Sequence, residues 1–474
     1  MENNKMSVVS QNSYRPLKLE RQKSYRELFH FFLDESTPAP EKEKLSAQLL
    51  QRELHQIDPP SIPLPDEPVQ IKDWLFQQNM QNCERYQQYL SRRQAGGQRE
   101  YFQHVAAAYD FLVKVAPVKY VDGSWLYSTL KHWSDPNFQH LIMIYLEELG
   151  LGSAKANHVS MYQQLLSSLN LQDLVEGLED EYYYQPVVQL ALAYAPQQYL
   201  PEVIGFNLGY EQLPLHLLIS NYELAELGLD HQYFNVHITI DNLDNGHAHR
   251  SVAALEYGYS QAANKTEFID KLKRGYALND VGLGSTEIIK NSDLTPLIEK
   301  IFKKKAVVGK LIHNNRCRFA QASVNEWLSN DQKVVEFLQV LQDKQWIKRG
   351  QHPSESRFWQ LIHNEEGKMF GVFSVAEQQI IYDWIAQAYT ERRAPFKAVT
   401  PVQQVDDYIY IVDYFNSSEQ QALQQQLKLA RSAEEKINLL LPYLAPHQHH
   451  NPTGLWATRQ LTQFLFPQAL QQIQ

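Results

Sequence analysis

The chain has 474 residues, of which 43% are hydrophobic and 12% aromatic; this composition excludes an intrinsically disordered protein, and the length exceeds one ordinary domain. Its 54 acidic residues outnumber its 44 basic residues, and the resulting formal net charge of -10 disfavours nucleic acid as the main partner. With only two cysteines, neither a disulfide framework nor a cysteine zinc site can form, so a transition metal would need nitrogen and oxygen ligands.

The sequence carries no recognisable targeting or membrane-spanning signal. Its N-terminal stretch MENNKMSVVSQNSYRPLKLERQKSY lacks the apolar core of a secretory signal. No uninterrupted apolar run approaches the roughly 20 residues that a membrane helix requires. We therefore expect a soluble, cytoplasmic protein with no membrane partner, and the low cysteine content agrees with a reducing compartment.

The N-terminal region, residues 1–70, is predicted to precede the main fold. A polar tail extends to about residue 20, and a helical pattern follows over 21–56. The next stretch, DPPSIPLPDEP (58–68), contains five prolines and predicts an extended connector.

Helical periodicity dominates residues 71–290, which we predict to form an all-α bundle. Apolar residues such as Met80, Tyr86 and Leu90 recur at helical spacing in its first segment. The following helix is predicted to stop at Pro117, because proline lacks the backbone N–H that continues a helix.

Two further regions follow the bundle. We predict a mostly helical extension over 291–395, in which Ser374 and Glu377 have the spacing of a capping box. An appendage of unknown role occupies 396–474. It contains the best strand candidate of the chain, DDYIYIVDYF (406–415), although strand-like alternation is rare elsewhere.

The stretch FNVHITIDNLDNGHAHR (234–250) is the first candidate metal-binding segment. His237 and Asp241 are four residues apart and share one helical face, which Asp244 continues. Imidazole and carboxylate on one face suit iron, manganese or zinc. A solvent-exposed helix or a structural histidine would give the same pattern, so this segment alone does not establish a site.

A second candidate lies in LEELGLGSAKANHVSMY. Glu147 and Glu148 end one predicted helix, and His158 begins the next. In a continuous helix Glu148 and His158 would lie about 15 Å apart, too far to share a metal. Gly150 and Gly152 permit a turn that would bring them together. A core histidine bonded to a backbone carbonyl is the alternative for His158.

Glu211, in GFNLGYEQLPLHLL, is the third candidate. Its predicted helical face is otherwise apolar, and a carboxylate there is costly to bury unless it is paired or bound to a metal. Pro214 should kink the helix beside it. An ordinary ion pair is the alternative for Glu211 alone. Carboxylates and histidines on several helices of one bundle are, however, how two-metal carboxylate sites are built.

These motifs resemble the haem-oxygenase-like non-haem diiron oxidases and oxygenases, also called iron-containing redox enzymes. In chain order, the resemblance is carried by DGSWL (122–126), EELGLG....NH (147–158), GYE (209–211), HITIDNLDNGHA (237–248) and GKMFGVFSVAEQQIIYDWI (367–385). It covers about residues 100 to 390. It implies a haem-oxygenase-like helical bundle without haem, with additional N-terminal and C-terminal extensions that are mostly helical.

The resemblance also implies the activity and the ligands. It implies two Fe(II) ions, O2 as co-substrate, and an amino-acid-like or fatty-acid-like substrate that undergoes N-oxygenation, desaturation or C–C cleavage. The implied metal ligands are Glu148, His158, Glu211, His237, Asp241 and His247. Glu211 is expected to bridge the two ions. Glu147 competes with Glu148 for the first position, and the glycine spacing favours Glu148.

The third ligand segment contains a geometric conflict. On a regular α-helix Asp241 and His247 point about 240° apart, so they cannot face one site together. Local unwinding at Gly246 would turn His247 inward. Without it, Asp244 would be the sixth ligand.

Other functions and partners remain open from the sequence. A non-catalytic helical interaction protein with a vestigial metal site would show the same helical pattern. A thiaminase-like hydrolase on the same broad fold is a third reading, but neither Cys83 nor Cys317 lies in these motifs. We expect a small-molecule substrate and, in a homodimer, a second copy of the chain. Arg250 would meet either a substrate carboxylate or a surface ion-pair partner.

Overall fold

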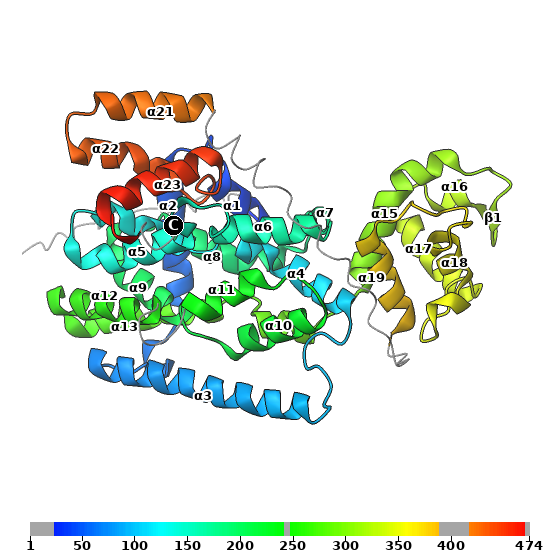
Figure 1. The fold of residues 1–474 in the computed structure, drawn as a ribbon, viewed down its shortest axis with the longest axis horizontal. Helices are drawn as coiled ribbons and strands as arrows, with labels where there is room; N and C mark the ends of the chain where they lie inside the picture. The colour runs from blue at the N-terminus through cyan, green and yellow to red at the C-terminus, as the bar shows by residue number, and fades with distance from the viewer. Residues whose placement is uncertain (1–22, 241–246, 388–416, 470–474) are drawn as a thin grey trace, which may run out of the picture.

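The computed structural model describes residues 23–240, 247–387 and 417–469, which are folded almost entirely into helices (Figure 1). The prediction of an all-α fold is confirmed: the strands in these ranges are one short antiparallel pair, β1 (Arg318–Phe319) and β2 (Ala322–Ser323). The strand candidate at 406–415 lies outside the described residues. Among the described helices, none is long and apolar enough to cross a membrane.

Three helices precede the main bundle: α1 (Tyr25–Leu33), α2 (Ala39–His55) and α3 (Pro68–Gln94). The continuous helical pattern expected over 21–56 is divided, because Asp34 is extended and accepts hydrogen bonds from the residues that follow it. Pro38 is also extended and precedes α2. The proline-rich connector contains a 3-10 turn, η1 (Pro59–Ser61), and Pro68 already belongs to the first turn of α3, where a missing N–H costs nothing.

The main bundle consists of α4 (Val105–Lys119), η2 (Ser124–His132), η3 (Pro136–Phe138), α5 (Gln139–Glu148), η4 (Gly150–Gly152), α6 (His158–Ser168), α7 (Gln172–Val175), η5 (Asp180–Tyr183), α8 (Tyr184–Ala193), η6 (Gln197–Tyr199), α9 (Leu200–Tyr210), α10 (Leu215–Glu226), α11 (Gln232–Ile240), α12 (His247–Gln261), α13 (Lys265–Ala277) and η7 (Leu278–Asp280). The expected helix end at Pro117 is wrong, since α4 continues to Lys119. A proline this close to a helix end removes one hydrogen bond without preventing the final turn.

Close packing at two places holds the bundle around its centre. α9 and α13 touch through glycines: a Cβ added at Gly205 would lie 2.0 Å from the Leu272 carbonyl oxygen, and one at Gly275 would lie 2.0 Å from the Glu202 carbonyl oxygen. Trp125 of η2 is fully buried, and its indole N–H donates to Asn207 of α9 at 2.9 Å. The 3-10 turn after residue 122 is therefore anchored directly to the helix that leads to residue 211.

α14 (Ser285–Lys290) packs against α4 of the bundle. The elements after it gather at one end of the molecule (Figure 1): α15 (Thr295–Ile312), α16 (Val324–Trp327), α17 (Asp331–Asp343), η8 (Pro353–Glu355), α18 (Arg357–His363) and α19 (Val375–Ala386). The capping box predicted for Ser374 and Glu377 is confirmed at the start of α19. Asp383 of α19 accepts a hydrogen bond from the Ala106 N–H at 3.0 Å, which joins α19 to the N-terminus of α4.

The last described elements return to the bundle. They are α21 (Ser418–Leu429), α22 (Ala433–Leu440), η9 (Leu441–Leu444) and α23 (Pro452–Leu465). Figure 1 shows α21, α22 and α23 stacked on the side of the bundle opposite α3, and α23 is the one nearest to the bundle. The Tyr145 hydroxyl of α5 donates to the Leu444 carbonyl, so this segment is bonded to the bundle interior.

Candidate metal centre

Two overlapping groups of buried side chains lie where the bundle helices meet. The first group is Asp122, Glu148, His158 and His237, and the second is Glu148, Glu211 and His247. Within each group, one ligand atom from every residue lies within 4.8 Å of the others. Glu148 belongs to both groups, so two metal positions would share one carboxylate.

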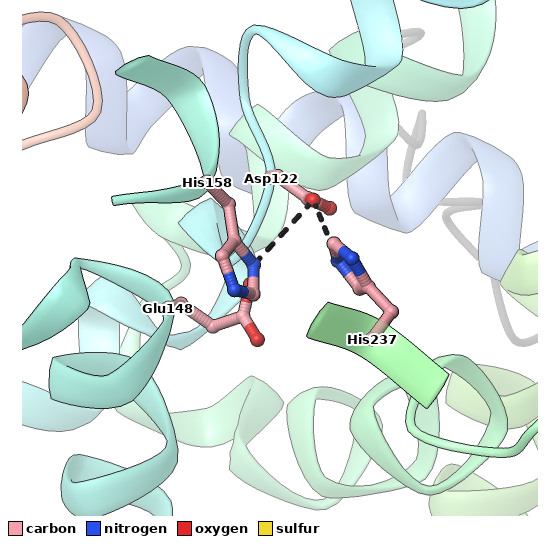
Figure 2. A group of neighbouring side chains, drawn as sticks. All are labelled: Asp122, Glu148, His158 and His237. Carbon is pink, nitrogen blue, oxygen red and sulfur yellow. Dashed lines mark hydrogen bonds and ion pairs between the residues drawn. The ribbon is translucent and has the colours of Figure 1, made fainter. Parts of the chain in front are cut away.

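The first group draws its four side chains from the turn before η2 and from α5, α6 and α11 (Figure 2). Glu148 Oε2 lies 2.7 Å from His158 Nδ1, and Asp122 Oδ2 lies 3.2 Å from His237 Nε2. Asp122 Oδ2 also lies 3.8 Å from His158 Nδ1. Two carboxylates and two imidazoles therefore converge on one small volume.

The turn between Glu148 and His158 has the form that the glycines predict. α5 ends at Glu148 and α6 begins at His158, while Leu149 and Asn157 form an isolated antiparallel bridge that closes the turn. Gly150 has φ +64°, and a Cβ there would lie 2.3 Å from the Asn157 backbone nitrogen. Only glycine fits this position, which explains how residues ten apart in sequence come within hydrogen-bonding distance.

Asp122 enters the site through a second glycine contact. Gly123 has φ +75°, and a Cβ there would lie 2.6 Å from the Glu148 Cβ. The absence of a side chain at 123 allows the start of η2 to lie directly against Glu148. Asp122, the preceding residue, is thereby placed beside the other carboxylate.

The second group forms at the end of α9 and the start of α12. His247 Nδ1 lies 2.9 Å from Glu211 Oε2 and 3.5 Å from Glu148 Oε1. The kink expected from Pro214 is a complete break: α9 ends at Tyr210, and Pro214 precedes α10 in an extended conformation. Glu211 follows the last turn of α9 directly and is only 3% exposed.

Hydrogen bonds orient the rings of His237 and His247, so that one particular nitrogen of each ring faces the carboxylates of its group. His237 Nδ1 lies 2.8 Å from the Tyr233 carbonyl oxygen and donates to it, which leaves Nε2 toward Asp122. His247 Nε2 lies 3.0 Å from Glu147 Oε2, and Nδ1 faces Glu211 and Glu148. A histidine that donates one N–H to a carboxylate or carbonyl and presents the other nitrogen is the usual arrangement of a metal ligand.

Asp122 is also held by phenol groups. Tyr210 donates to Asp122 Oδ1 at 3.0 Å, and Tyr233 donates to Asp122 Oδ2. The Lys119 ammonium lies 5.4 Å from the centre of the Tyr233 ring. Burial alone would raise the pKa of Asp122, but Lys119 and His237 lower it below the usual range, so the carboxylate is ionised.

Burial and charge act differently on the two remaining carboxylates. Burial raises the pKa of Glu148, but His158 opposes this effect and brings the net pKa below its usual value. For Glu211 burial outweighs the attraction of His247, and the net pKa is raised. Burial would lower the pKa of His247, yet Glu211, Glu147 and Glu148 raise it well above the histidine range. Protonation of His247 in the metal-free chain thus offsets part of the negative charge of these buried carboxylates.

The structure brings together five of the six ligands expected from the sequence: Glu148, His158, Glu211, His237 and His247. The sixth, Asp241, lies outside the described residues, as do Asp244 and Gly246. α11 is described to Ile240 and α12 from His247, so the unwinding expected at Gly246 and the choice between Asp241 and Asp244 concern residues outside the described ranges.

Sequence reasoning missed Asp122 as a member of the site. The motif DGSWL carries part of the family resemblance, but its aspartate follows no helical ligand pattern because it precedes a 3-10 turn. The signal available in the sequence was the adjacent glycine, which permits close approach to another chain segment. Glu147 is not in either group and instead bonds to His247 and to Arg250, so Arg250 forms an ion pair.

The donor set fits iron. Carboxylate oxygens with imidazole nitrogens and no thiolate suit iron, manganese or zinc rather than soft metals. Glu211 Oε1 is buried and has no hydrogen-bond partner in the described part of the chain. Such an orphaned carboxylate oxygen is costly, and a metal ion would satisfy it.

Comparison with known proteins agrees with this geometry. A family model described as iron-containing redox enzyme matches residues 109–280. Neither the curated proteins nor the solved structures yielded a match. The matched range contains both groups of candidate ligands and ends with η7, so α14 and everything after it lie outside the match. Over residues 109–280 the chain is therefore similar to the iron-containing redox enzymes, and its all-α bundle agrees with a haem-oxygenase-like fold.

Proposed function

We propose that this iron oxidoreductase is an O2-dependent diiron enzyme that oxidises a small organic substrate. One observation carries the proposal: Glu148 is a member of two separate groups of potential metal ligands. A single metal would need only one such group, whereas two ions sharing a carboxylate need two that overlap.

In this proposal each group holds one ion. Asp122, His158 and His237 complete the first position, and Glu211 and His247 complete the second. Glu148 takes the bridging role that the sequence had assigned to Glu211, because Glu148 lies between the imidazoles of His158 and His247. The second position has fewer ligands from the described residues, which leaves room there for exchangeable ligands.

Surrounding residues keep this centre dry and correctly oriented. Asp122, Glu148, His158 and His247 are all at most 3% exposed, so bulk water is excluded from the ligands. Tyr210 and Tyr233 hold the Asp122 carboxylate, and Glu147 fixes the His247 ring. Two bound ferrous ions would supply the electrons that reduce O2 and thereby allow the oxidation of an unactivated organic group.

The substrate class and partners are further parts of the proposal. We propose an amino-acid-like or fatty-acid-like substrate, with N-oxygenation, desaturation or C–C cleavage as the outcome. Neither nucleic acid nor a membrane is needed as a partner, and a homodimer is compatible with the chain. The two cysteines are exposed and belong to neither ligand group, which disfavours the thiol-dependent hydrolase.

Anaerobic loading with ferrous iron tests the proposal. The chain should retain about two iron ions after removal of excess metal, and admission of O2 should change its absorption spectrum. A manganese-loaded or zinc-loaded sample is the control for a spectral change that requires iron. Less than about one iron per chain with no response to O2 would contradict the enzyme and favour the non-catalytic interaction protein.

A further inference from the structure

The turn that joins the two ligands Glu148 and His158 depends on one buried side chain, Asn157. Asn157 precedes α6, and its side-chain oxygen accepts a hydrogen bond from the Ser160 N–H at 3.0 Å. Its amide nitrogen lies 3.3 Å from the Leu149 carbonyl oxygen on the opposite side of the turn. Asn157 therefore fixes both the first turn of α6 and the closure of the loop, and His158 is the next residue.

The remaining contact of the Asn157 amide comes from the C-terminal part of the chain. Its nitrogen lies 3.1 Å from His449 Nδ1, and both side chains are 0% exposed. An amide nitrogen can only donate, so His449 Nδ1 is the acceptor and the ring proton is on Nε2. Nε2 has no hydrogen-bond partner among the described residues, so this tautomer leaves an unsatisfied N–H that the fold retains at a cost.

The backbone of α23, which follows His449 in sequence, packs on the turn between Glu148 and His158. A Cβ added at Gly152 would lie 2.5 Å from the Leu455 carbonyl oxygen and 2.7 Å from the Arg459 backbone nitrogen. Figure 1 shows α23 lying against the bundle on the side of α5 and α6. The ligand-bearing turn is thus enclosed by residues about 300 positions later, none of which lies within the matched range 109–280.

We infer that His449 is a positioning residue of the metal centre, and that the segment from η9 to α23 is part of the framework that sets the separation of Glu148 and His158. Through Asn157, His449 holds the first turn of α6 in place, and this keeps His158 Nδ1 at 2.7 Å from Glu148 Oε2. The inference rests on the proposed function, because it concerns the affinity of the first metal position.

Metal titration of the full-length chain tests the inference. Wild type, His449→Leu and His449→Asn are titrated anaerobically with Co(II), and calorimetry gives the dissociation constant at each position. Loss of the acceptor in His449→Leu should weaken the first position by about tenfold, within the range found for residues that orient metal ligands. His449→Asn places an acceptor oxygen near the site of Nδ1 and should bind within about twofold of wild type.

His450→Leu is the matched control. His450 is the adjacent histidine, its ring centre lies 5.3 Å from that of His449, and its Nδ1 is also buried without a partner in the described residues. This variant should bind Co(II) like wild type. The second position should be unchanged in all variants, whereas a general loss of folding would weaken both positions and lower the melting temperature of the metal-free chain.

A second variant guards against failure of His449→Leu to fold. Asn157→Ser retains a helix-capping oxygen but removes the amide donor, so it should weaken the first position to a similar extent. Combined with His449→Leu, the two changes should be non-additive because they break the same bond. Wild-type affinity in His449→Leu, or an equal loss in His450→Leu, overturns the inference alone. A wild-type chain that binds no Co(II) or Fe(II) overturns the proposed function and this inference together.

Discussion

The two candidate metal positions use the same residue types but are anchored differently. The first position is enclosed by side chains whose partners are themselves buried: Tyr233 holds both Asp122 and His237. The second position depends on His247, which is held by Glu147, whose side chain is 23% exposed. Matching ligand chemistry therefore does not imply matching rigidity, because rigidity comes from the residues behind the ligands.

The pKa shifts of the two buried glutamates also distinguish the two positions, and they again favour the first. Glu148 and Glu211 are both 3% exposed, yet the pKa of Glu148 is lowered and that of Glu211 is raised. The difference follows from their partners, since among the described residues Glu148 is paired with two imidazoles, whereas Glu211 is paired with one, that of His247. We expect the first position to bind metal more tightly than the second.

Replacement of the shared carboxylate should have the largest effect. Glu148→Ala removes a ligand from both groups and leaves His158 without its 2.7 Å partner. Iron content measured after anaerobic loading should fall from about two ions per chain to nearly none. Retention of one tightly bound ion would show that Glu148 belongs to a single position, and the proposed bridge would then be wrong.

Replacement of a ligand of one group should separate the positions. Glu211→Ala should remove the second ion and leave the first, so the bound iron should fall by about half. The observable is again iron per chain, supported by Co(II) calorimetry with one remaining transition. If loading is unchanged, Glu211 is not a ligand, and the contrast between the two positions loses its basis.

A smaller effect is expected from the residue behind His247. Glu147→Gln keeps the size of the side chain but removes the charge that pairs with Arg250 and accepts from His247 Nε2. The dissociation constant of the second position should rise by about 10-fold to 100-fold, while the first position is unaffected. Glu256→Gln, an exposed carboxylate on the same helix α12, serves as the control and should change neither. Equal weakening of both positions would argue against a specific role for Glu147.

Replacement of Glu202 should have the smallest effect on metal binding. Glu202 is a carboxylate on α9 that is as buried as Glu211 but belongs to neither ligand group. Burial raises the pKa of Glu202 from 4.5 to about 7. Above pH 7 the folded chain must therefore ionise a buried group, whereas below pH 4.5 the group is neutral in both folded and unfolded chains.

Glu202→Gln should accordingly leave metal binding unchanged and stabilise the protein at high pH. The free energy of unfolding of the metal-free chain should increase by about 1–3 kcal/mol at pH 8. This gain should shrink towards zero as the pH falls from 7 to 4.5, as urea unfolding at several pH values would show. If this variant bound less iron, a buried carboxylate outside both ligand groups would affect iron binding, and the assignment of the ligands by these groups would be contradicted.

Local signals in the sequence were sufficient for much of this centre. Glycines predicted the turn between Glu148 and His158, and the all-α fold followed from periodicity. Proline was less informative about exact boundaries: Pro117 is tolerated within α4, while Pro214 accompanies a complete break. The difference depends on how much helix remains beyond each proline and on the packing around it, which a local pattern does not contain.

Long-range contacts account for what the sequence could not provide. Asp122 joins the site only because Gly123 packs against Glu148, and His449 reaches Asn157 across 292 positions. Neither contact leaves a periodic or spaced pattern, since each depends on how distant segments pack in three dimensions. The choice of Glu148 rather than Glu147 as a group member, by contrast, agrees with the glycine spacing.

The contact between His449 and Asn157 also bears on how the protein is made. During synthesis the chain from 109 to 280 emerges well before residue 449, so the ligand-bearing turn initially lacks its last hydrogen-bond partner and the packing of α23 against Gly152. Ribosome-bound chains that end before η9 should therefore hold iron less firmly than released chains. Late arrival of this segment would delay the assembly of a reactive iron centre until η9 and α23 have been translated.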